Sequence, residues 1–279
     1  MGKKMTKIDF FTCLGPNSAD YAEFLKYTGE KFLSCKNEIN WKCVNSKCDR
    51  IPEGYKLVCN SKDLGQVSMN HAEALHSAQN YIESDYVIFI DSDVAILYQD
   101  WDQVIIDELN KNDCFGGAFV NRLKKYRDFP SVYLFSFRSH ILNKVQLDFY
   151  PKLRKDNKLK NCSHKLNKEE AYYYNMSEGQ YIHCDTGWKL PFIIRKVGIT
   201  YNVMNAIPIT SENIQLPFED KSQKEICISK PKHMSEWHYN GKLFAAHKHA
   251  SYGVDDLKSE RCSVWKKRVD LYIKNIMEE

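Results

Sequence analysis

The triplet Asp91-Ser92-Asp93 is the stretch whose residue types and spacing most directly suggest chemistry. It follows residues 86–90, a run of five apolar or aromatic residues of which three are Val or Ile. Such a run is typical of a strand buried on both faces of a parallel sheet, and ligands of open α/β sheets bind at the carboxyl ends of the strands. Carboxylates there supply the hard oxygen ligands that Mg²⁺ and Mn²⁺ prefer, and these ions bind diphosphates. The triplet therefore predicts a metal site at Asp91 and Asp93. The alternative is a pair of loop carboxylates that cap the next segment.

The sequence excludes two other kinds of binding site, an EF-hand calcium loop at Asp91 and a phosphate-binding P-loop. An EF-hand loop that began at Asp91 would place Ile96 at its sixth position, where a glycine is required. The phosphate-binding sequence GxxxxGK followed by Ser or Thr does not occur.

Two histidines near the end of the chain, His247 and His249, are further candidate metal ligands. They lie in residues 242–249, KLFAAHKH, which reads as a strand. On a strand these two side chains project to the same face, and imidazole is a common ligand of transition ions such as Mn²⁺. Lys248 is expected to face the other way and to be solvated.

The composition is that of an ordinary globular protein and limits the range of partners. The chain has 279 residues, 43% hydrophobic and 27% charged, with a net charge of +4 and a pI of about 8.4. Nucleic-acid-binding proteins are usually more basic than this, so no nucleic-acid partner is expected. The sequence shows no signal peptide and no membrane span, so we expect a cytoplasmic protein. The ten cysteines lack CxxC pairs and are expected to be mostly reduced thiols.

The elements that must position these residues alternate over the first half of the chain. The pattern predicts strands at 7–13, 55–59 and 86–90, a short strand near 41–44, and helices at about 17–34, 68–83 and 101–110. Asn17 or Ser18 is expected to cap the first helix, and Ser68 the second. Such alternation is typical of a parallel sheet with helical crossovers.

The second half of the chain is more mixed. Strands are expected at 114–120, 131–137, 192–197 and 242–249, and a helix at about 254–277. Gly116 and Gly117 would allow another group to approach the backbone closely. Residues 152–168 contain seven lysines or arginines and form either a solvated loop or a lid that contacts an anionic acceptor or phosphate. No internal repeat and no linker is evident, so one domain is expected.

Residues 71–97, HAEALHSAQNYIESDYVIFIDSDVAIL, resemble the nucleotide-binding half of GT-A glycosyltransferases, which use nucleotide-diphosphate sugars. In that group a helix precedes a buried strand that ends in a DxD motif. The resemblance is firmest over residues 7 to about 120 and extends more loosely to about 250. It implies a single α/β domain with a mostly parallel central sheet flanked by helices. The nucleotide-sugar-binding half would cover about 1–120, a smaller mixed acceptor-side half about 121–250, and a C-terminal helix about 251–279.

The same resemblance implies roles for residues of the donor site. Asp93 would bind a Mn²⁺ or Mg²⁺ ion on the donor diphosphate, and Asp91 would contact the ribose or the water shell of the ion. A late histidine would complete the metal site, with His249 preferred over His247. The further nucleotide-sugar-binding residues would be Thr12, Cys13, Leu14, Asn60, His71 and Ser92.

On the acceptor side, the resemblance implies an Asp or Glu close to the incoming hydroxyl. Asp185, in the sequence HCDTGW, is the candidate general base of an inverting reaction, and Glu178 is its nearest competitor. Trp188 could stack on a sugar ring, and Gly187 would permit a tight approach. The alternative is an ordinary Asp-Thr-Gly turn with Trp188 in the core.

The expected function is metal-dependent transfer of a hexosyl or pentosyl group from a UDP- or GDP-sugar to a hydroxyl of a glycan, glycoprotein or glycolipid. One alternative is a non-catalytic nucleotide-sugar-binding protein on the same fold. The other is a sugar-phosphate nucleotidylyltransferase. Those enzymes carry a glycine-rich, arginine-containing loop after the first strand, which residues 14–18, LGPNS, do not match.

Overall fold

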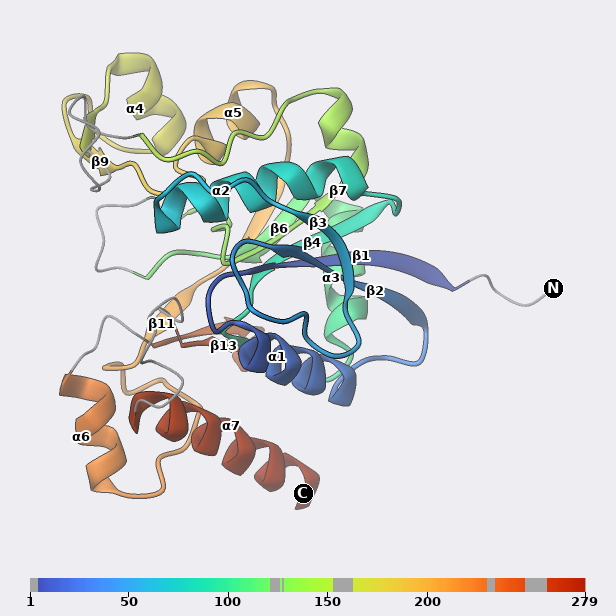
Figure 1. Cartoon of the computed structure of the whole chain (residues 1–279). Helices are drawn as coiled ribbons and strands as arrows, with labels where there is room; N and C mark the ends of the chain where they lie inside the picture. Colours follow the sequence, from blue (N-terminus) through green and yellow to red (C-terminus); the bar gives the residue numbers. More distant parts are fainter. Residues whose placement is uncertain are drawn as a thin grey trace.

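The computed structural model describes residues 5–120, 126, 128–152, 163–229, 234–248 and 260–278 (Figure 1). Within these ranges no helix is both long enough and apolar enough to cross a membrane. The nine cysteines in them are free thiols.

A seven-stranded sheet forms the centre of the molecule, with the strand order β10-β6-β7-β4-β1-β2-β3. Only β7 runs antiparallel to its neighbours β4 and β6, and the other four neighbouring pairs are parallel. The predicted mostly parallel central sheet is therefore confirmed. Its strands are β1 (Thr6–Leu14), β2 (Asn37–Asn45), β3 (Lys56–Asn60), β4 (Tyr86–Asp91), β6 (Cys114–Gly117), β7 (Leu134–Arg138) and β10 (Tyr201–Met204).

Helices cover both faces of this sheet, and successive residues of β4 show why it is apolar throughout. Ile88 and Ile90 pack in one hydrophobic core with α1 (Ala19–Lys31) and α3 (Trp101–Lys111). Val87 and Phe89 pack in a second core with α2 (Val67–Ala78). Figure 1 shows α1 and α2 on opposite sides of the sheet. A strand with both faces covered must be apolar at every position, as the sequence of residues 86–90 indicates.

A second, four-stranded sheet begins at the Asp triplet. Only two residues, Ser92 and Asp93, separate the end of β4 at Asp91 from the start of β5 (Val94–Ile96). The order of this antiparallel sheet is β11-β12-β13-β5, with β11 (Ala206–Pro208), β12 (Ser235–Tyr239) and β13 (Lys242–His247). The triplet therefore joins the two sheets, and β13 lies beside the strand that follows it.

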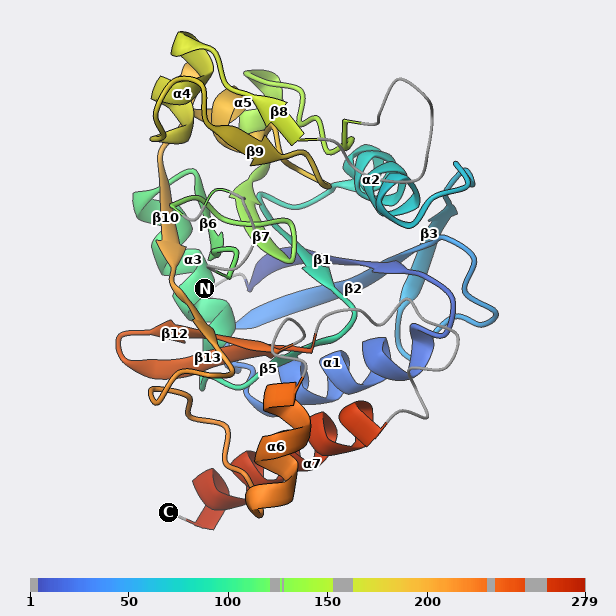
Figure 2. The same ribbon diagram turned by 90° about the vertical axis from the view of Figure 1, so that its left-hand side faces the viewer.

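The remaining elements form two peripheral groups (Figure 2). The short strand β9 (Tyr181–His183) and the helices α4 (Lys168–Tyr174) and α5 (Leu190–Lys196) share the hydrophobic core of α2, and β8 (Ser163–Lys165) pairs with β9. On the other side of the large sheet lie α6 (Lys221–Ser229) and α7 (Glu260–Glu278). Two short 3₁₀ helices, η1 (Gln79–Tyr81) and η2 (Ser139–Asn143), complete the described part of the chain.

The prediction of a strand at residues 192–197 is wrong, because this segment lies in helix α5. Phe192 and two isoleucines suggested a strand, but the buried residues Leu190 and Ile194 have helical spacing. Pro191 suits the first turn, and Gly198, at φ +72°, follows the end of the helix.

The predicted helix caps agree with the structure only in the position of one residue. Ser18 occupies the N-cap of α1, but its side chain makes no capping hydrogen bond to the helix, and its hydroxyl instead accepts the Gly15 N–H at 3.1 Å. Ser68 does not cap α2, because the N-cap is Gln66 and Ser68 lies inside the first turn. The other predicted strands and helices exist, with ends displaced by a few residues. The predicted last helix and last strand extend into residues 249–259, which lie outside the described ranges.

Candidate active site

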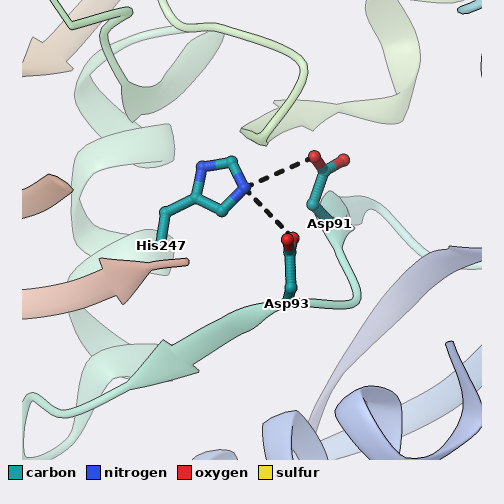
Figure 3. A group of neighbouring side chains, drawn as sticks. All are labelled: Asp91, Asp93 and His247. Carbon is teal, nitrogen blue, oxygen red and sulfur yellow. Dashed lines mark hydrogen bonds and ion pairs between the residues drawn. The ribbon is translucent and has the colours of Figure 1, made fainter. Parts of the chain in front are cut away.

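Asp91, Asp93 and His247 form a compact group at the junction of the two sheets (Figure 3). His247 ends β13, and its Cα pairs with that of Val94 at the start of β5. The Lys248 N–H also donates to the Asp93 carbonyl at 3.0 Å. This antiparallel register brings a histidine from the end of the chain onto the turn that carries both aspartates.

The distances within the group suit a divalent cation. His247 Nε2 lies 3.1 Å from Asp93 Oδ1 and 3.6 Å from Asp91 Oδ2. Ligand atoms at right angles on an octahedral ion, with bonds of about 2.1 Å, are about 3.0 Å apart. Among the described residues this is the group of three potential ligands whose donor atoms all lie within 4.8 Å of one another. Two carboxylates and one imidazole are a donor set for Mn²⁺ or Mg²⁺.

Aromatic rings fix the orientation of the His247 imidazole. The indole of Trp237, on β12, stacks on it with centroids 5.5 Å apart and an angle of 27° between the planes. The Tyr133 ring meets it edge-on at 4.8 Å. A side chain at Gly117 would come within 2.3 Å of the Trp237 indole, so this glycine makes room for the stack. The predicted close approach at the glycine pair is thereby confirmed.

His71, on α2, holds the other oxygen of Asp91. Its Nε2 lies 3.2 Å from Asp91 Oδ1, and the Cys13 thiol is its other polar neighbour. Burial by itself would lower the pKa of His71. The negative charge of Asp91 and the hydrogen bonds to Asp91 and Cys13 outweigh this effect and raise the pKa well above 6.5. His71 therefore fixes one oxygen of the Asp91 carboxylate, while the other faces His247.

These residues open into a cavity of about 210 Å³ at the carboxyl edge of the large sheet. Loops after β1, β2 and β4 form one part of its wall, and α2 and the turn after β9 form the other. Its lining residues are Cys13, Leu14, Gly15, Ser18, Ser46, Val67, Ser68, His71, Asp91, Ser92, Asp93, Tyr133, Asp185 and Thr186.

Most of the predicted donor-binding residues, but not all, line this cavity. Thr12 lies just behind the lining, fully buried, and its hydroxyl has no hydrogen-bond partner among the described residues. Asn60 is exposed at the end of β3, where it accepts a hydrogen bond from Asn45 at 3.1 Å, and it does not line the cavity. His249 lies outside the described residues, so the structure places only His247 of the late pair.

The structure brings Asp185 into the same cavity through a tight turn. Its Oδ1 accepts the Thr186 N–H at 2.8 Å, and the Thr186 hydroxyl donates to the Ser68 carbonyl of α2 at 3.1 Å. Gly187 has a φ of +74°, and a side chain there would come within 2.3 Å of Val132. Trp188 follows at 7% exposure in the α2-side core. Val132 thus leaves no room for a side chain at position 187.

Glu178 is not part of this group of residues. It is exposed in the turn between α4 and β9, and it does not line the cavity.

Several cavity residues were not predicted from the sequence. Ser46 directly follows β2. It could have been predicted in the same way as Asp91, because ligands of open α/β sheets bind at the carboxyl ends of the strands. Tyr133 gave no comparable signal, because it precedes β7 and reaches the site through packing on His247. Lys248 was predicted to be solvated, but it is 2% exposed, with its ammonium 4.9 Å from the centre of the Tyr21 ring. The packing of β13 beside β5 buries it.

No protein-family model and no curated protein matches the sequence. Among solved structures, the chain is similar to the galactosyltransferase LgtC in complex with donor and acceptor sugar analogues, at 11% identity over 95% of both chains with a TM-score of 0.49. It is similar to the mannosyltransferase PcManGT from Pyrobaculum calidifontis in complex with GDP-Man and Mn²⁺, at 14% identity over 55% of this chain and 50% of that one with a TM-score of 0.38. It is also similar to S. aureus TarS 1–349 in complex with UDP, at 16% identity over 52% of this chain and 50% of that one with a TM-score of 0.37. The match thus spans about half the length of the PcManGT and TarS chains. These similar structures are of glycosyltransferases, the class that the DxD-containing stretch resembles.

Proposed function

We propose that this protein is a metal-dependent glycosyltransferase that moves a sugar from a nucleotide-diphosphate donor to a hydroxyl group. The observation that carries the proposal is the convergence of Asp91, Asp93 and His247 on one point of a cavity at the carboxyl edge of the sheet. This edge is where ligands of open α/β sheets bind.

The donor diphosphate would lie against this group. Asp93 Oδ1, Asp91 Oδ2 and His247 Nε2 would hold the ion, which leaves the other positions of an octahedral shell for diphosphate oxygens and water. Such an ion offsets the negative charge that develops on the departing nucleotide diphosphate. The cavity is smaller than the roughly 300–1,000 Å³ of typical ligand pockets, so the donor would extend beyond it toward the surface.

The nucleoside would lie along the ends of β1 and β2. Cys13, Leu14 and Gly15 form the first of these ends and Ser46 the second. Ser46 is buried, and its hydroxyl has no partner among the described residues, so a ribose or base could supply one.

Asp185 would accept the proton of the incoming hydroxyl. It lines the same cavity as the metal group, and the Thr186–Ser68 hydrogen bond ties its turn to α2, the helix that also carries His71. A carboxylate held in this way can act as a general base when the acceptor enters from the side of β9.

A panel of UDP- and GDP-sugars tests the proposal. We expect slow hydrolysis of at least one donor with Mn²⁺ and none with EDTA. Asp93→Asn should abolish the hydrolysis, whereas Asp107→Asn, which changes an exposed carboxylate on α3, should not. Metal-dependent binding without hydrolysis or transfer would instead indicate a nucleotide-sugar-binding protein.

A further inference from the structure

A second cavity, of about 400 Å³, lies beside the candidate active site. Three rings, two lysines and one carboxylate form most of its lining: Tyr150, His164, Trp188, Lys152, Lys189 and Glu170. None of these residues has a part in the donor site described above.

One turn of the chain separates the two cavities. Asp185 and Thr186 line the first cavity, and Trp188 and Lys189 line the second. The Trp188 N–H donates to the Asp185 carbonyl at 3.0 Å. The two Cα atoms of such a turn are within about 7 Å of each other. A molecule held against Trp188 would therefore be close to the candidate base.

The aromatic side of the second cavity is held in place by its neighbours. The His164 ring lies 5.4 Å from Trp188, at an angle of 56°. The carbonyl of Trp188 accepts the Tyr174 hydroxyl at 2.5 Å. The Tyr150 hydroxyl donates to Glu73 of α2. Rigid aromatic walls with a few polar groups are typical of small-molecule sites, and a sugar ring can pack its C–H face on them.

The polar side of the second cavity is a chain of hydrogen bonds that ends in a lysine. Lys152 Nζ lies 2.9 Å from His164 Nδ1, and His164 Nε2 lies 2.8 Å from Glu170 Oε1. A lysine only donates, so Nδ1 is the acceptor and Nε2 carries the hydrogen that Glu170 receives. The carboxylate of Glu170 is already engaged by His164 and by the Asn167 N–H.

Two lysine ammonium groups lie at the second cavity. Lys152 is exposed, and its ammonium carries three donors, so it can bind His164 and an anion at once. Lys189 is 42% exposed and pairs with Asp148 at 2.5 Å. Residues 153–162, which hold most of the basic tract predicted from the sequence, lie outside the described ranges. The ammonium groups of Lys152 and Lys189 are the donors that an anion could meet in the second cavity.

We infer that the second cavity is the acceptor subsite and takes an acidic saccharide, a sugar that carries a carboxylate or a phosphate group. Its ring would pack on Trp188, and its anionic group would pair with Lys152 and Lys189. The role of this saccharide as acceptor rests on the proposed function, whereas its binding to the second cavity does not.

Direct binding measurements on the full chain test this inference without any turnover. Saturation-transfer NMR and calorimetry at low ionic strength would compare glucuronate, glucose 6-phosphate, glucose and inorganic phosphate. We expect glucuronate or glucose 6-phosphate to bind at least ten times more tightly than both glucose and phosphate. Comparison of the two acidic sugars shows whether a carboxylate or a phosphate group is preferred. Glucose binding as tightly as both acidic sugars, or phosphate alone binding as tightly as glucose 6-phosphate, would overturn the inference.

Variants of the two lysines assign the binding to this cavity. Lys152→Ala and Lys189→Ala should each weaken binding of the preferred acidic sugar at least five-fold and leave glucose binding unchanged. The matched control is Lys196→Ala on α5, whose lysine pairs with Glu169 at 2.9 Å and does not line the cavity. Equal effects of all three changes, or no effect of any, would contradict the assignment.

The outcome for nucleotides separates the two proposals. If acidic sugars bind but no nucleotide binds with Mn²⁺, the second cavity is a saccharide site and the proposed glycosyltransferase function is refuted. Nucleotides that bind with Mn²⁺ while no acidic sugar binds would refute the subsite alone.

Discussion

His247 Nε2 lies 3.1 Å from Asp93 Oδ1, although the two residues are 154 positions apart in the chain. The contact arises because β4 continues almost directly into β5, and β5 pairs with β13. The DxD turn therefore belongs to two sheets at once, one that supplies the carboxylates and one that supplies the imidazole.

Removing the imidazole should weaken metal binding strongly. We expect His247→Ala to lower the affinity for Mn²⁺ at least ten-fold, because the two carboxylates lose their third partner. Electron paramagnetic resonance of free Mn²⁺ measures this affinity. His140→Ala, which changes a more exposed histidine paired with Asp113, is the control and should leave it unchanged. Unchanged Mn²⁺ affinity in His247→Ala would exclude this histidine as a ligand.

His71 should act on the metal through Asp91. Because it holds Asp91 Oδ1 at 3.2 Å, His71→Ala should release that carboxylate and lower the Mn²⁺ affinity about 10- to 100-fold, with no nucleotide present. A residue that contacted only the donor would leave the affinity for Mn²⁺ alone unchanged. Titrations of Mn²⁺ with and without UDP or GDP distinguish the two roles.

Asp185→Asn should impair chemistry more than donor binding. Asparagine can still accept the Thr186 N–H through its carbonyl oxygen, so the turn should persist. Loss of a general base lowers turnover by about 10²- to 10⁴-fold. The transfer rate should therefore fall while the dissociation constant of the donor stays nearly unchanged. NMR of the product should show inverted anomeric configuration. Full activity in this variant, or a retained configuration, would contradict the assigned role.

The buried ion pair of Asp9 and Lys42 should contribute to stability in a pH-dependent way. Asp9 is fully buried, lies 3.0 Å from Lys42 Nζ and accepts the Glu83 and Ser84 N–H groups at 2.6 and 2.9 Å. Burial raises the pKa of Asp9, but the hydrogen bonds from Glu83, Asn40 and Lys42 outweigh it and lower the pKa below 3.8. We expect Asp9→Asn to reduce the free energy of unfolding by about 2 kcal/mol at pH 7, because charge-assisted hydrogen bonds to a buried carboxylate are lost while Lys42 keeps Glu83 at 2.7 Å.

The direction of the shift fixes the pH range of this effect. A carboxyl with a lower pKa in the folded state stabilises the fold above its unfolded pKa and loses that contribution as the pH falls through the folded value. The free energies of unfolding of the wild type and Asp9→Asn, measured with urea, should therefore differ less and less below about pH 4. A difference that grows as the pH falls would show that Asp9 is protonated in the native state.

The position of the aspartates could be predicted from the sequence, but the choice between the late histidines could not. An apolar run that ends in two carboxylates predicts a strand edge, and the structure places Asp91 and Asp93 at one. Alternation on a strand puts His247 and His249 on the same face. Which of them meets the aspartates depends on the register of β13 against β5, which is a tertiary contact. The structure describes that contact for His247.

Tertiary contacts also explain the other differences between the predicted and the observed structure. Residues 192–197 are rich in apolar and β-branched side chains, which suit a buried helix as well as a strand, and the packing of Leu190 and Ile194 decides between them. Lys248 is buried because β13 lies against the rest of the molecule, which local polarity does not reveal. Tyr133 likewise joins the site only through its contact with His247.

The most direct test of the central claim is a calorimetric titration of UDP and GDP into the wild type and Asp93→Asn, each with Mn²⁺ and with EDTA. We predict binding of one nucleotide by the wild type with Mn²⁺, loss of that binding with EDTA, and loss of it in Asp93→Asn. Nucleotide binding that is equally tight with EDTA, or that persists undiminished in Asp93→Asn with Mn²⁺, would contradict a metal-dependent donor site at this turn.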